Sequence, residues 1–226
     1  NRDIEVQGGA NITAGTIQAV GTITGPVPGN SGALPIRDPF ARLDLNPPTP
    51  CAAAPTDILV RGTQTLTLAP GVHCDNFLVR GNSTLQLQPG EHWFMGNIEF
   101  RGNARLRGDD VVLIFGLNER FDFGGRADVE LTARRTGPFA GFLIATTRNN
   151  TQTFAITSDR VRELLGTIYI PEAHLLIRTT GSVAQDSAWS VIVAETITMR
   201  DDPVLVINTG YAGSGVPVPT GVGPSA

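Results

Sequence analysis

The segment Ile58-Leu59-Val60-Arg61-Gly62 recurs as Phe77-Leu78-Val79-Arg80-Gly81 and again as Ile98-Glu99-Phe100-Arg101-Gly102. Each copy is followed by a polar stretch and then by alternating apolar residues, as in Thr65-Leu66-Thr67-Leu68. Alternation with a period of two predicts short, half-buried strands. The glycine predicts a corner that needs positive φ or close backbone approach. The repeating unit is therefore a strand, a corner and a second strand.

The spacing of these units decides between the repeat folds. With a fourth copy at 121–125, the aligned glycines are 19, 21 and 23 residues apart, and weaker copies begin at residues 4, 154, 175 and 197. Periods near 20 with strands predict a solenoid. The leucine-rich L-x-x-L-x-L-x-x-N signature is missing, and the spacing is too irregular for strict hexapeptides. We predict an all-β right-handed parallel β-helix of about eight coils, with a β-sandwich as the alternative.

One domain is expected over residues 1–212, followed by a flexible Gly/Pro-rich tail at 213–226. Residues 25–55 are rich in proline, which cannot donate to a strand ladder, so they predict an excursion between the first coil and the second. Residues 132–152 predict a longer connection, and residues 158–165 a helical turn or short helix. The first coil starts at residue 4 with an open strand edge, so we expect a preceding segment or another subunit to cover it.

Composition and charge exclude several classes of function. The net charge is −4, and all 17 cationic residues are arginine, which argues against a nucleic-acid partner because such proteins present a strongly basic face. No Walker loop and no G-x-S-x-G motif is present, so no cofactor and no nucleophilic serine is predicted. No apolar run approaches the ~20 residues that span a bilayer.

Cys51 and Cys74 are the two cysteines of the chain. A pair in a small Thr/Asn/Gly-rich protein suits an oxidising compartment, and a bond between them would add roughly 3 kcal/mol in the chain-entropy model. Two buried free thiols are the alternative. Neither residue belongs to a C-x-x-C pair, so no zinc site is predicted.

Seven segments, in this order, resemble TadG-like proteins (TadE/TadG family) of the bacterial tight-adherence (Flp-type) pilus system, over nearly the whole chain. They are 4–24, Asp38-Pro39-Phe40-Ala41-Arg42-Leu43, Leu68-Ala69-Pro70-Gly71-Val72-His73-Cys74, Leu87-Gln88-Pro89-Gly90, 136–141, 166–171 and 192–197. His73 and His92 stand where tyrosine is common in the family. The resemblance implies a surface-exposed β-helical region in the periplasm or at the cell surface, with pilus or envelope proteins as partners. It also implies a membrane anchor, expected in a segment N-terminal to this sequence, and no catalytic residues.

The candidate catalytic and metal residues each have a structural explanation. Asp109-Asp110 and Asp201-Asp202 are the paired carboxylates, but both lie at expected corners, where aspartate serves turns. His73 and His92 take the same position in successive units, where stacked imidazoles with Glu91 could hold a metal. A side-chain ladder on one face of the coil explains the histidines equally, because no third ligand converges. We therefore predict no catalytic set and no metal.

An arginine follows an inward apolar residue in five of the units. These residues are Arg61, Arg80, Arg101, Arg178 and Arg200. Stacked coils would place such side chains ~5 Å apart on one exposed edge, where like charges repel. Pairing with Glu99 or Asp122 on adjoining strands would offset the cost. The alternative is a basic edge for an anionic partner, such as an acidic glycan or a carboxylate-rich pilus face.

The leading hypothesis is a non-catalytic structural or adhesin-like surface module of a pilus system. The first alternative is a carbohydrate-active β-helix enzyme, a lyase or hydrolase, which would need clustered carboxylates. The second is a glycan-binding module, for which Trp93 and Tyr169 would be the exposed platforms.

Overall fold

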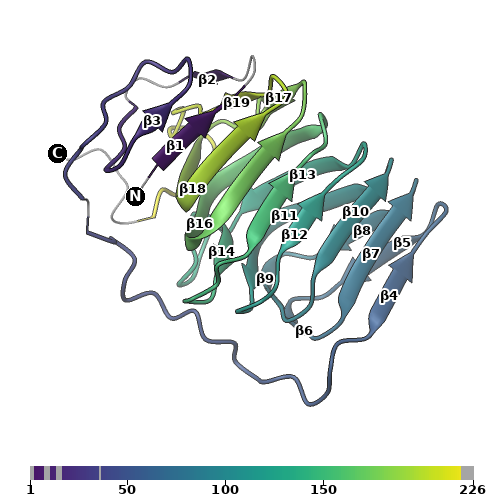
Figure 1. The fold of residues 1–226 in the computed structure, drawn as a ribbon. Helices are drawn as coiled ribbons and strands as arrows, with labels where there is room; N and C mark the ends of the chain where they lie inside the picture. Colours follow the sequence, from purple (N-terminus) through teal and green to yellow (C-terminus); the bar gives the residue numbers. More distant parts are fainter. Residues whose placement is uncertain (1–2, 8–10, 14–16, 36, 220–226) are drawn as a thin grey trace.

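The computed structural model describes residues 3–7, 11–13, 17–35 and 37–219 (Figure 1). These residues form 19 strands and no helix, and the paired strands run parallel. The strands wind into about nine stacked coils, which confirms the predicted parallel β-helix with one coil more than expected. A coil has three sides, so three parallel sheets run along the solenoid.

The first sheet contains the repeated Ile-x-Val-Arg motif. In stacking order its strands are β3 (Ile23–Thr24), β1 (Asp3–Val6), the end of β18 (Ser190–Arg200), the end of β16 (Val161–Arg178), β15 (Thr153–Ile156), β12 (Phe121–Phe123), β10 (Ile98–Gly102), β7 (Asn76–Gly81) and β4 (Asp57–Val60).

The long strands β16 and β18, together with β11, bend around corners and so serve two or three sheets. The second sheet comprises β2 (Asn11–Thr13), β19 (Val204–Val206), β17 (Ser182–Val183), the start of β16, β13 (Asp128–Ala133), the start of β11 (Arg105–Phe115), β8 (Thr84–Leu87) and β5 (Thr65–Leu68). The third comprises the start of β18, the middle of β16, β14 (Phe142–Thr146), the end of β11, β9 (Gly90–Phe94) and β6 (Gly71–His73).

The coils do not stack in chain order. β1 pairs in register with the end of β18, from Asp3 opposite Thr196 to Val6 opposite Met199, and β3 pairs with the other edge of β1. The first coil of the sequence therefore lies against the last one. The segment 25–55 then runs along the solenoid to the far end, where β4 begins (Figure 1).

This arrangement corrects two predictions. The excursion follows the first coil, as expected, but it does not lead to a neighbouring coil. The edge of the first coil is not open either, since β1 has a strand on both sides. Every coil presents the same period-two pattern, so the repeat alone does not say which coils are neighbours.

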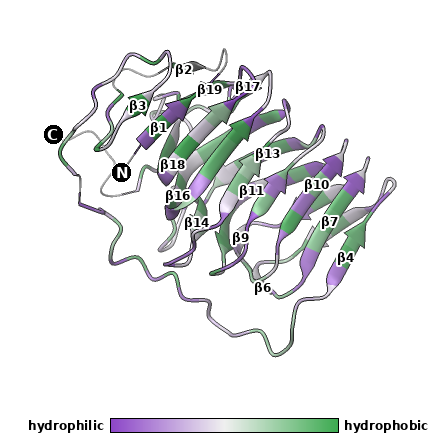
Figure 2. Ribbon diagram, in the orientation of Figure 1, coloured by the Kyte–Doolittle hydropathy of each residue, from purple (hydrophilic) through white to green (hydrophobic). Residues whose placement is uncertain are grey.

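Phenylalanines fill the interior of the solenoid. Six phenylalanine side chains are fully buried there, and their rings stack or meet edge to face in successive coils: Phe94, Phe100, Phe115, Phe121, Phe123 and Phe154. Hydrophobic and hydrophilic residues alternate along β10 (Figure 2), and the side chains of both β7 and β10 are alternately more and less buried.

The aligned glycines stack on one another at the corner between the first two sheets. Gly62, Gly81, Gly102 and Gly125 all have positive φ. A Cβ atom on Gly125 would lie 2.7 Å from the backbone nitrogen of Gly102. The glycine in each repeat is therefore required both by its backbone conformation and by the close approach of the next coil.

The outer surface of the third sheet is apolar and is covered by the segment 38–45. Phe40 of this segment meets the rings of Phe142 and Tyr169 edge to face, at centroid distances of 4.8 and 5.3 Å. Leu45 is buried with them, and Trp93 lies in the same cluster. The solenoid thus has a second core outside its wall, between the sheet and the segment that joins its two ends.

Two local predictions change. Residues 158–165 are not helical, because Val161 begins β16 and pairs with Val129 of β13. A bulge there separates the buried residues Val161 and Leu164 by three positions, which imitates helical spacing. The connection 132–152 contains a further strand, β14, which belongs to the third sheet.

The flexibility of residues 213–226 stays a prediction. Within the described part of this segment, Val216 is buried and the hydroxyl of Ser214 accepts a hydrogen bond from the indole N–H of Trp189. Residues 220–226 lie outside the described residues.

Candidate functional site

The five arginines of the repeat lie on one corner of the solenoid, but in two groups. Arg80 is directly opposite Arg101, and Arg178 is opposite Arg200. Arg61 follows Val60, which is opposite Val79, so it continues the first group.

The two coils between these groups carry Gly124 and Thr157 at the arginine position, bonded to the coil before through the carbonyls of Phe100 and Phe123. The predicted continuous edge is therefore interrupted, because the units at 121–125 and 154–157 break the motif.

Arg101 is neutralised by its own sheet. Its guanidinium lies 2.8 Å from the carboxylate of Asp122 and 2.9 Å from that of Glu99. The hydrogen bond to Asp122, followed by the charges of both carboxylates, raises the pKa of Arg101 above its usual value despite some burial. A Cβ on Gly124 would clash with this guanidinium, at 2.3 Å from Nη1. The predicted pairing with Glu99 and Asp122 is confirmed for this arginine.

Arg61 and Arg80 have different surroundings. Both side chains are exposed, and among the described residues neither has a carboxylate within 4 Å. The outward side chains beside them on β4 and β7 are Leu59 and Leu78, where the next coil has Glu99. In the second group, Arg178 reaches Asp201 at 3.9 Å between two exposed side chains. The candidate site for an anion is therefore the Arg61–Arg80 pair at the β4 end.

The second sheet carries a network of four charged residues that the sequence analysis did not predict. Arg107 lies 3.0 Å from Asp128 and 3.2 Å from Glu130, and Arg162 pairs with the same two carboxylates. Burial acts to raise the pKa of Asp128, but the hydrogen bonds and charges of both arginines outweigh it and hold that pKa below its usual value. Aligning Arg105-Leu106-Arg107 with Asp128-Val129-Glu130, one coil later, would have revealed the network.

The paired carboxylates serve corners. Arg135 binds Asp109 with two guanidinium nitrogens, at 2.7 and 2.9 Å, and Arg134 lies 2.6 Å from Asp110. The hydrogen bond from Arg135 is the main reason that the pKa of Asp109 is lowered. Asp110 has positive φ, as have both Asp201 and Asp202. Asp109 and Asp110 lie at the irregularity within β11, and Asp201 and Asp202 lie at the bend after β18, in agreement with a structural role for both pairs.

His73 and His92 form a pair inside the solenoid, not on its outer face. Nε2 of His73 lies 3.0 Å from Nδ1 of His92, and Nε2 of His92 lies 2.8 Å from the carbonyl oxygen of Gln88. One proton on each Nε2 satisfies both bonds with neutral rings. Burial, followed by the neighbouring ring of His92, lowers the pKa of His73 to about 4. Burial also lowers the pKa of His92.

The register of β6 and β9 explains how the histidines meet. Gly71, not His73, is directly opposite His92, so the two imidazoles meet diagonally. Among the described residues, no three His, Cys, Asp or Glu side chains converge as a metal site.

Trp93 and Tyr169 are not surface platforms. Trp93 is 4% exposed and Tyr169 is fully buried, because the segment 38–45 covers both. The hydroxyl of Tyr169 donates to Asp38 at 2.6 Å, and burial followed by this bond raises the pKa of Tyr169 to about 12. Arg148 holds the same segment by donating to the carbonyls of Phe40, Ala41 and Leu43. Trp93, Tyr169 and Arg148 therefore anchor the segment 25–55, which we call the crossing segment.

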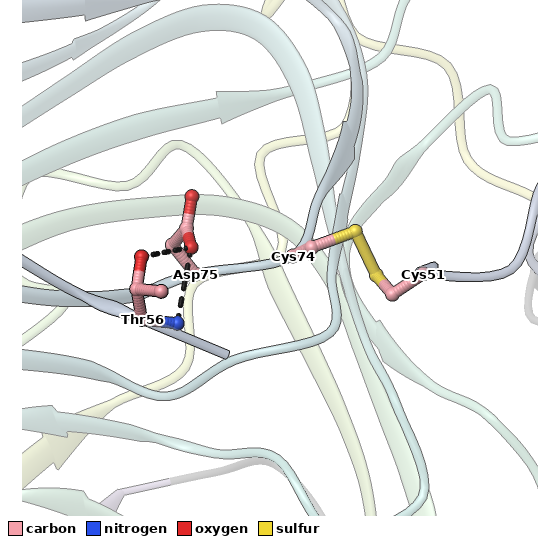
Figure 3. Close-up of a disulfide and its surroundings, with 4 residues drawn as sticks. All are labelled: Cys51, Thr56, Cys74 and Asp75. Atoms are coloured by element: carbon pink, nitrogen blue, oxygen red, sulfur yellow. Dashed lines mark hydrogen bonds between the residues drawn. A yellow bond between two sulfur atoms is a disulfide. The ribbon is translucent and has the colours of Figure 1, made fainter. Parts of the chain in front are cut away.

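The predicted disulfide between Cys51 and Cys74 is present, with 5.7 Å between the Cα atoms. It fixes the end of the crossing segment to the chain between β6 and β7 (Figure 3). Close by, the carboxylate of Asp75 accepts hydrogen bonds from the N–H and the hydroxyl of Thr56, at 3.1 and 2.6 Å. A disulfide of this kind is typical of proteins outside the reducing cytoplasm.

The part of the chain that the structure describes contains no helix long and apolar enough to cross a membrane. In comparisons with protein-family models, curated proteins and solved structures, no match to this chain was found.

Proposed function

We propose that this chain is a non-catalytic structural or adhesin-like surface module of a bacterial tight-adherence pilus system. The observation that carries the proposal is the architecture itself: about nine coils in one hydrogen-bonded stack, with a segment that ties one end to the other. At ~4.8 Å per coil the stack is a rod on the order of 40 Å long. Such a rod holds surfaces at a fixed separation, which is the task of a spacer or an adhesin.

The use of the charged residues supports a structural role. Asp109, Asp110, Asp128 and Glu130 are each held by arginines of the same or neighbouring coils. Carboxylates engaged in this way stabilise corners and sheet faces. A glycoside hydrolase would instead direct two such groups toward a bound sugar.

We place the protein in the periplasm or at the cell surface, where pilus or envelope proteins are its partners. The disulfide supports such an oxidising location. Arg61 and Arg80 would contact an anionic partner, because their charges are exposed and not used within the described part of the chain. An acidic glycan or a carboxylate-rich protein face has the complementary charge.

Cell fractionation and surface labelling of intact cells, with the full-length protein, test the location. Labelling at the surface or recovery from the periplasm supports the proposal, and recovery from the cytoplasm contradicts it. Loss of adhesion on deletion of the gene, with rescue by the intact gene, tests the role in the pilus system.

Binding to polygalacturonate across a range of salt concentrations tests the arginine pair. We expect binding that weakens with salt and that falls in Arg80→Gln but not in Arg126→Gln, a control at another exposed arginine. Equal binding by both variants would remove the arginine pair from the proposal. Release of unsaturated or shortened sugar products would identify an enzyme and overturn the non-catalytic assignment.

A further inference from the structure

The two ends of the solenoid are finished differently. At one end, residues 17–33 form a loop that supplies β3 and pairs it with β1; the N–H of Ala19 bonds to the carbonyl of Asn30 in this loop, and Val27 packs against the core. At the other end, β4, β5 and β6 each pair on one side only within the described residues. We call this second end, formed by β4, β5 and β6, the bare end.

The bare end leaves apolar side chains partly uncovered. Ile58, Leu66 and Leu68 point into the solenoid but are only half-buried. The residues opposite them in the next coil, Phe77, Leu85 and Leu87, are buried. The bare end thus combines strand edges with exposed core, which is what a strand-pairing partner would cover.

The edge strand at the bare end has a self-complementary sequence, Asp57-Ile58-Leu59-Val60-Arg61. Asp57, Leu59 and Arg61 point outward, and Ile58 and Val60 point inward. If a second copy of this strand pairs antiparallel with the first and Leu59 lies opposite Leu59, outward residues face outward residues and inward residues face inward ones. Asp57 then lies opposite Arg61, which is a favourable charge pair.

The backbone is suited to the same register. The carbonyl of Thr56 accepts the N–H of Asn76, so the even-numbered residues of this strand bond to β7. Alternate residues of a strand direct their N–H and C=O groups to opposite sides. The N–H and C=O of Leu59 therefore face the bare end. An antiparallel strand centred on Leu59 meets both groups.

We propose that the bare end is a dimerisation site, at which β4 pairs antiparallel with β4 of a second copy about a two-fold axis through Leu59. The two Leu59 residues exchange both backbone hydrogen bonds, and their side chains, each 40% exposed in the single chain, pack against each other. Asp57 of each copy pairs with Arg61 of the other. The inward faces of the two coils meet and cover Ile58, Leu66 and Leu68.

A second copy fits the bare end better than a continuing fibre does. A head-to-tail contact would need a regular strand edge at the far end, where β3 is only two residues long and belongs to the loop 17–33. A two-fold contact uses the same surface from both copies and closes. The disulfide joins the corner directly after β6 to the chain that leads into β4, so neither cysteine belongs to an edge strand. This inference goes beyond the proposed function and does not depend on it. In the dimer Arg61 is engaged by Asp57 of the other copy, which leaves Arg80 as the arginine for an anionic partner.

Sedimentation equilibrium of the full chain, from about 1 to about 100 µM, tests the proposal, because modest interfaces dissociate in that range. We expect a reversible dimer. Leu59→Arg places two cations at the axis and should leave a monomer. Leu117→Arg is the matched control, since Leu117 is 51% exposed and lies away from the bare end, and it should dimerise like the wild type. A wild type that is monomeric throughout, or a dimer that persists in Leu59→Arg, overturns the proposal.

Charge exchange tests the register. Asp57→Arg and Arg61→Asp each turn two attractive pairs into two repulsive ones, so each should weaken dimerisation by about tenfold or more. The double variant Asp57→Arg/Arg61→Asp restores the opposite charges and should recover most of the affinity. Thermal melting checks that each variant folds, because Asp57 also accepts a hydrogen bond from Asn76. A folded double variant as weak as the single ones rules out the β4 register.

Discussion

The terminal coils at the two ends of the solenoid are held in place by different interactions. The bare end is formed by residues 57–73 and is secured covalently, by the disulfide between Cys51 and Cys74. The opposite end is formed by residues from the start of the chain, which pair with β18 and β19 through backbone hydrogen bonds. The same Asp–Thr hydrogen-bond motif occurs at both ends. The carboxylate of Asp75 accepts hydrogen bonds from the N–H and hydroxyl of Thr56, and that of Asp3 accepts the same two from Thr22.

This difference indicates which interactions stabilise each end of the solenoid. The coil at the bare end has neighbours on one side only, and a cross-link compensates for the missing contacts. The first coil of the sequence has neighbours on both sides, and it depends on the crossing segment that delivers it there. We therefore expect changes to the disulfide and to the histidine pair to act on the bare end, and changes to the crossing segment to act on the third sheet and the opposite end.

The largest effect is expected from the crossing segment. Phe40→Ala removes the ring that packs on Phe142 and Tyr169, and should lower the free energy of unfolding by about 3 kcal/mol. Urea denaturation measures it. Leu34→Ala, on the same segment but 87% exposed, is the control and should leave stability unchanged. Equal stability of both variants would show that the segment does not hold the third sheet.

The disulfide should have a similar or slightly smaller effect, confined to the bare end. Cys51→Ser/Cys74→Ser removes the constraint on the unfolded chain, which is worth about 3 kcal/mol in the chain-entropy model. Limited proteolysis should then cut the chain near residues 47–56, while the opposite end stays resistant. Reductant should affect the wild type and not the double variant. If both respond alike, the cross-link is not the cause.

Acid should weaken the bare end through the histidine pair. As pH falls below 6.5 the unfolded chain binds a proton at His73, while the folded chain resists until the pH reaches about 4. The free energy of unfolding should therefore fall between pH 6.5 and pH 4, by about 1–2 kcal/mol once partial exposure is allowed for. The positive charge of Arg134 adds to the cost of protonating His92.

Urea denaturation at several pH values measures this loss. His73→Gln keeps a donor for His92 but does not titrate, so its stability should depend less on pH in this window. A variant with an unchanged pH dependence would assign the effect to other groups.

The smallest effect on stability is expected from loss of the two Asp–Thr hydrogen-bond motifs. Asp75→Ala and Asp3→Ala should lower the melting temperature only slightly, because the carboxylates lie at the surface. Amide hydrogen exchange distinguishes the local effects of the two substitutions. The amide of Thr22 should exchange much faster in Asp3→Ala, whereas that of Thr56 should change less in Asp75→Ala, because the disulfide still holds the neighbouring chain. Equal acceleration at both ends would mean that the cross-link does not restrain β4.

Much of the fold is present in the sequence. The repeat of 58–62, 77–81 and 98–102 predicts strands that the structure stacks in register, and the corner glycines take positive φ as expected. The pairing of Arg101 with Glu99 and Asp122 was also accessible, because alternation places these side chains on one face. These features are local, or relate one coil to the next.

Other features were not accessible from the residues alone. Trp93 and Tyr169 read as surface aromatics because alternation points them outward, and nothing in the repeat says that Phe40 covers them. Residues 158–165 read as helical because a bulge in β16 disguised the strand period. The arginine edge was interrupted because two units lack the motif, and a side chain from Arg101 occupies the space beside Gly124.

The sequence by itself determined the unit of this protein: a coil with inward apolar residues, a glycine corner and a period near 20. Tertiary structure alone decided the order of the coils and so which strands are left at the ends. The physical reason is that a strand edge is recognised by backbone hydrogen bonds and alternation, which all coils share. Closing a longer loop costs little more entropy than closing a short one. The strands β1, β2 and β3 could therefore stack at the far end of the solenoid, which leaves β4 as an edge strand.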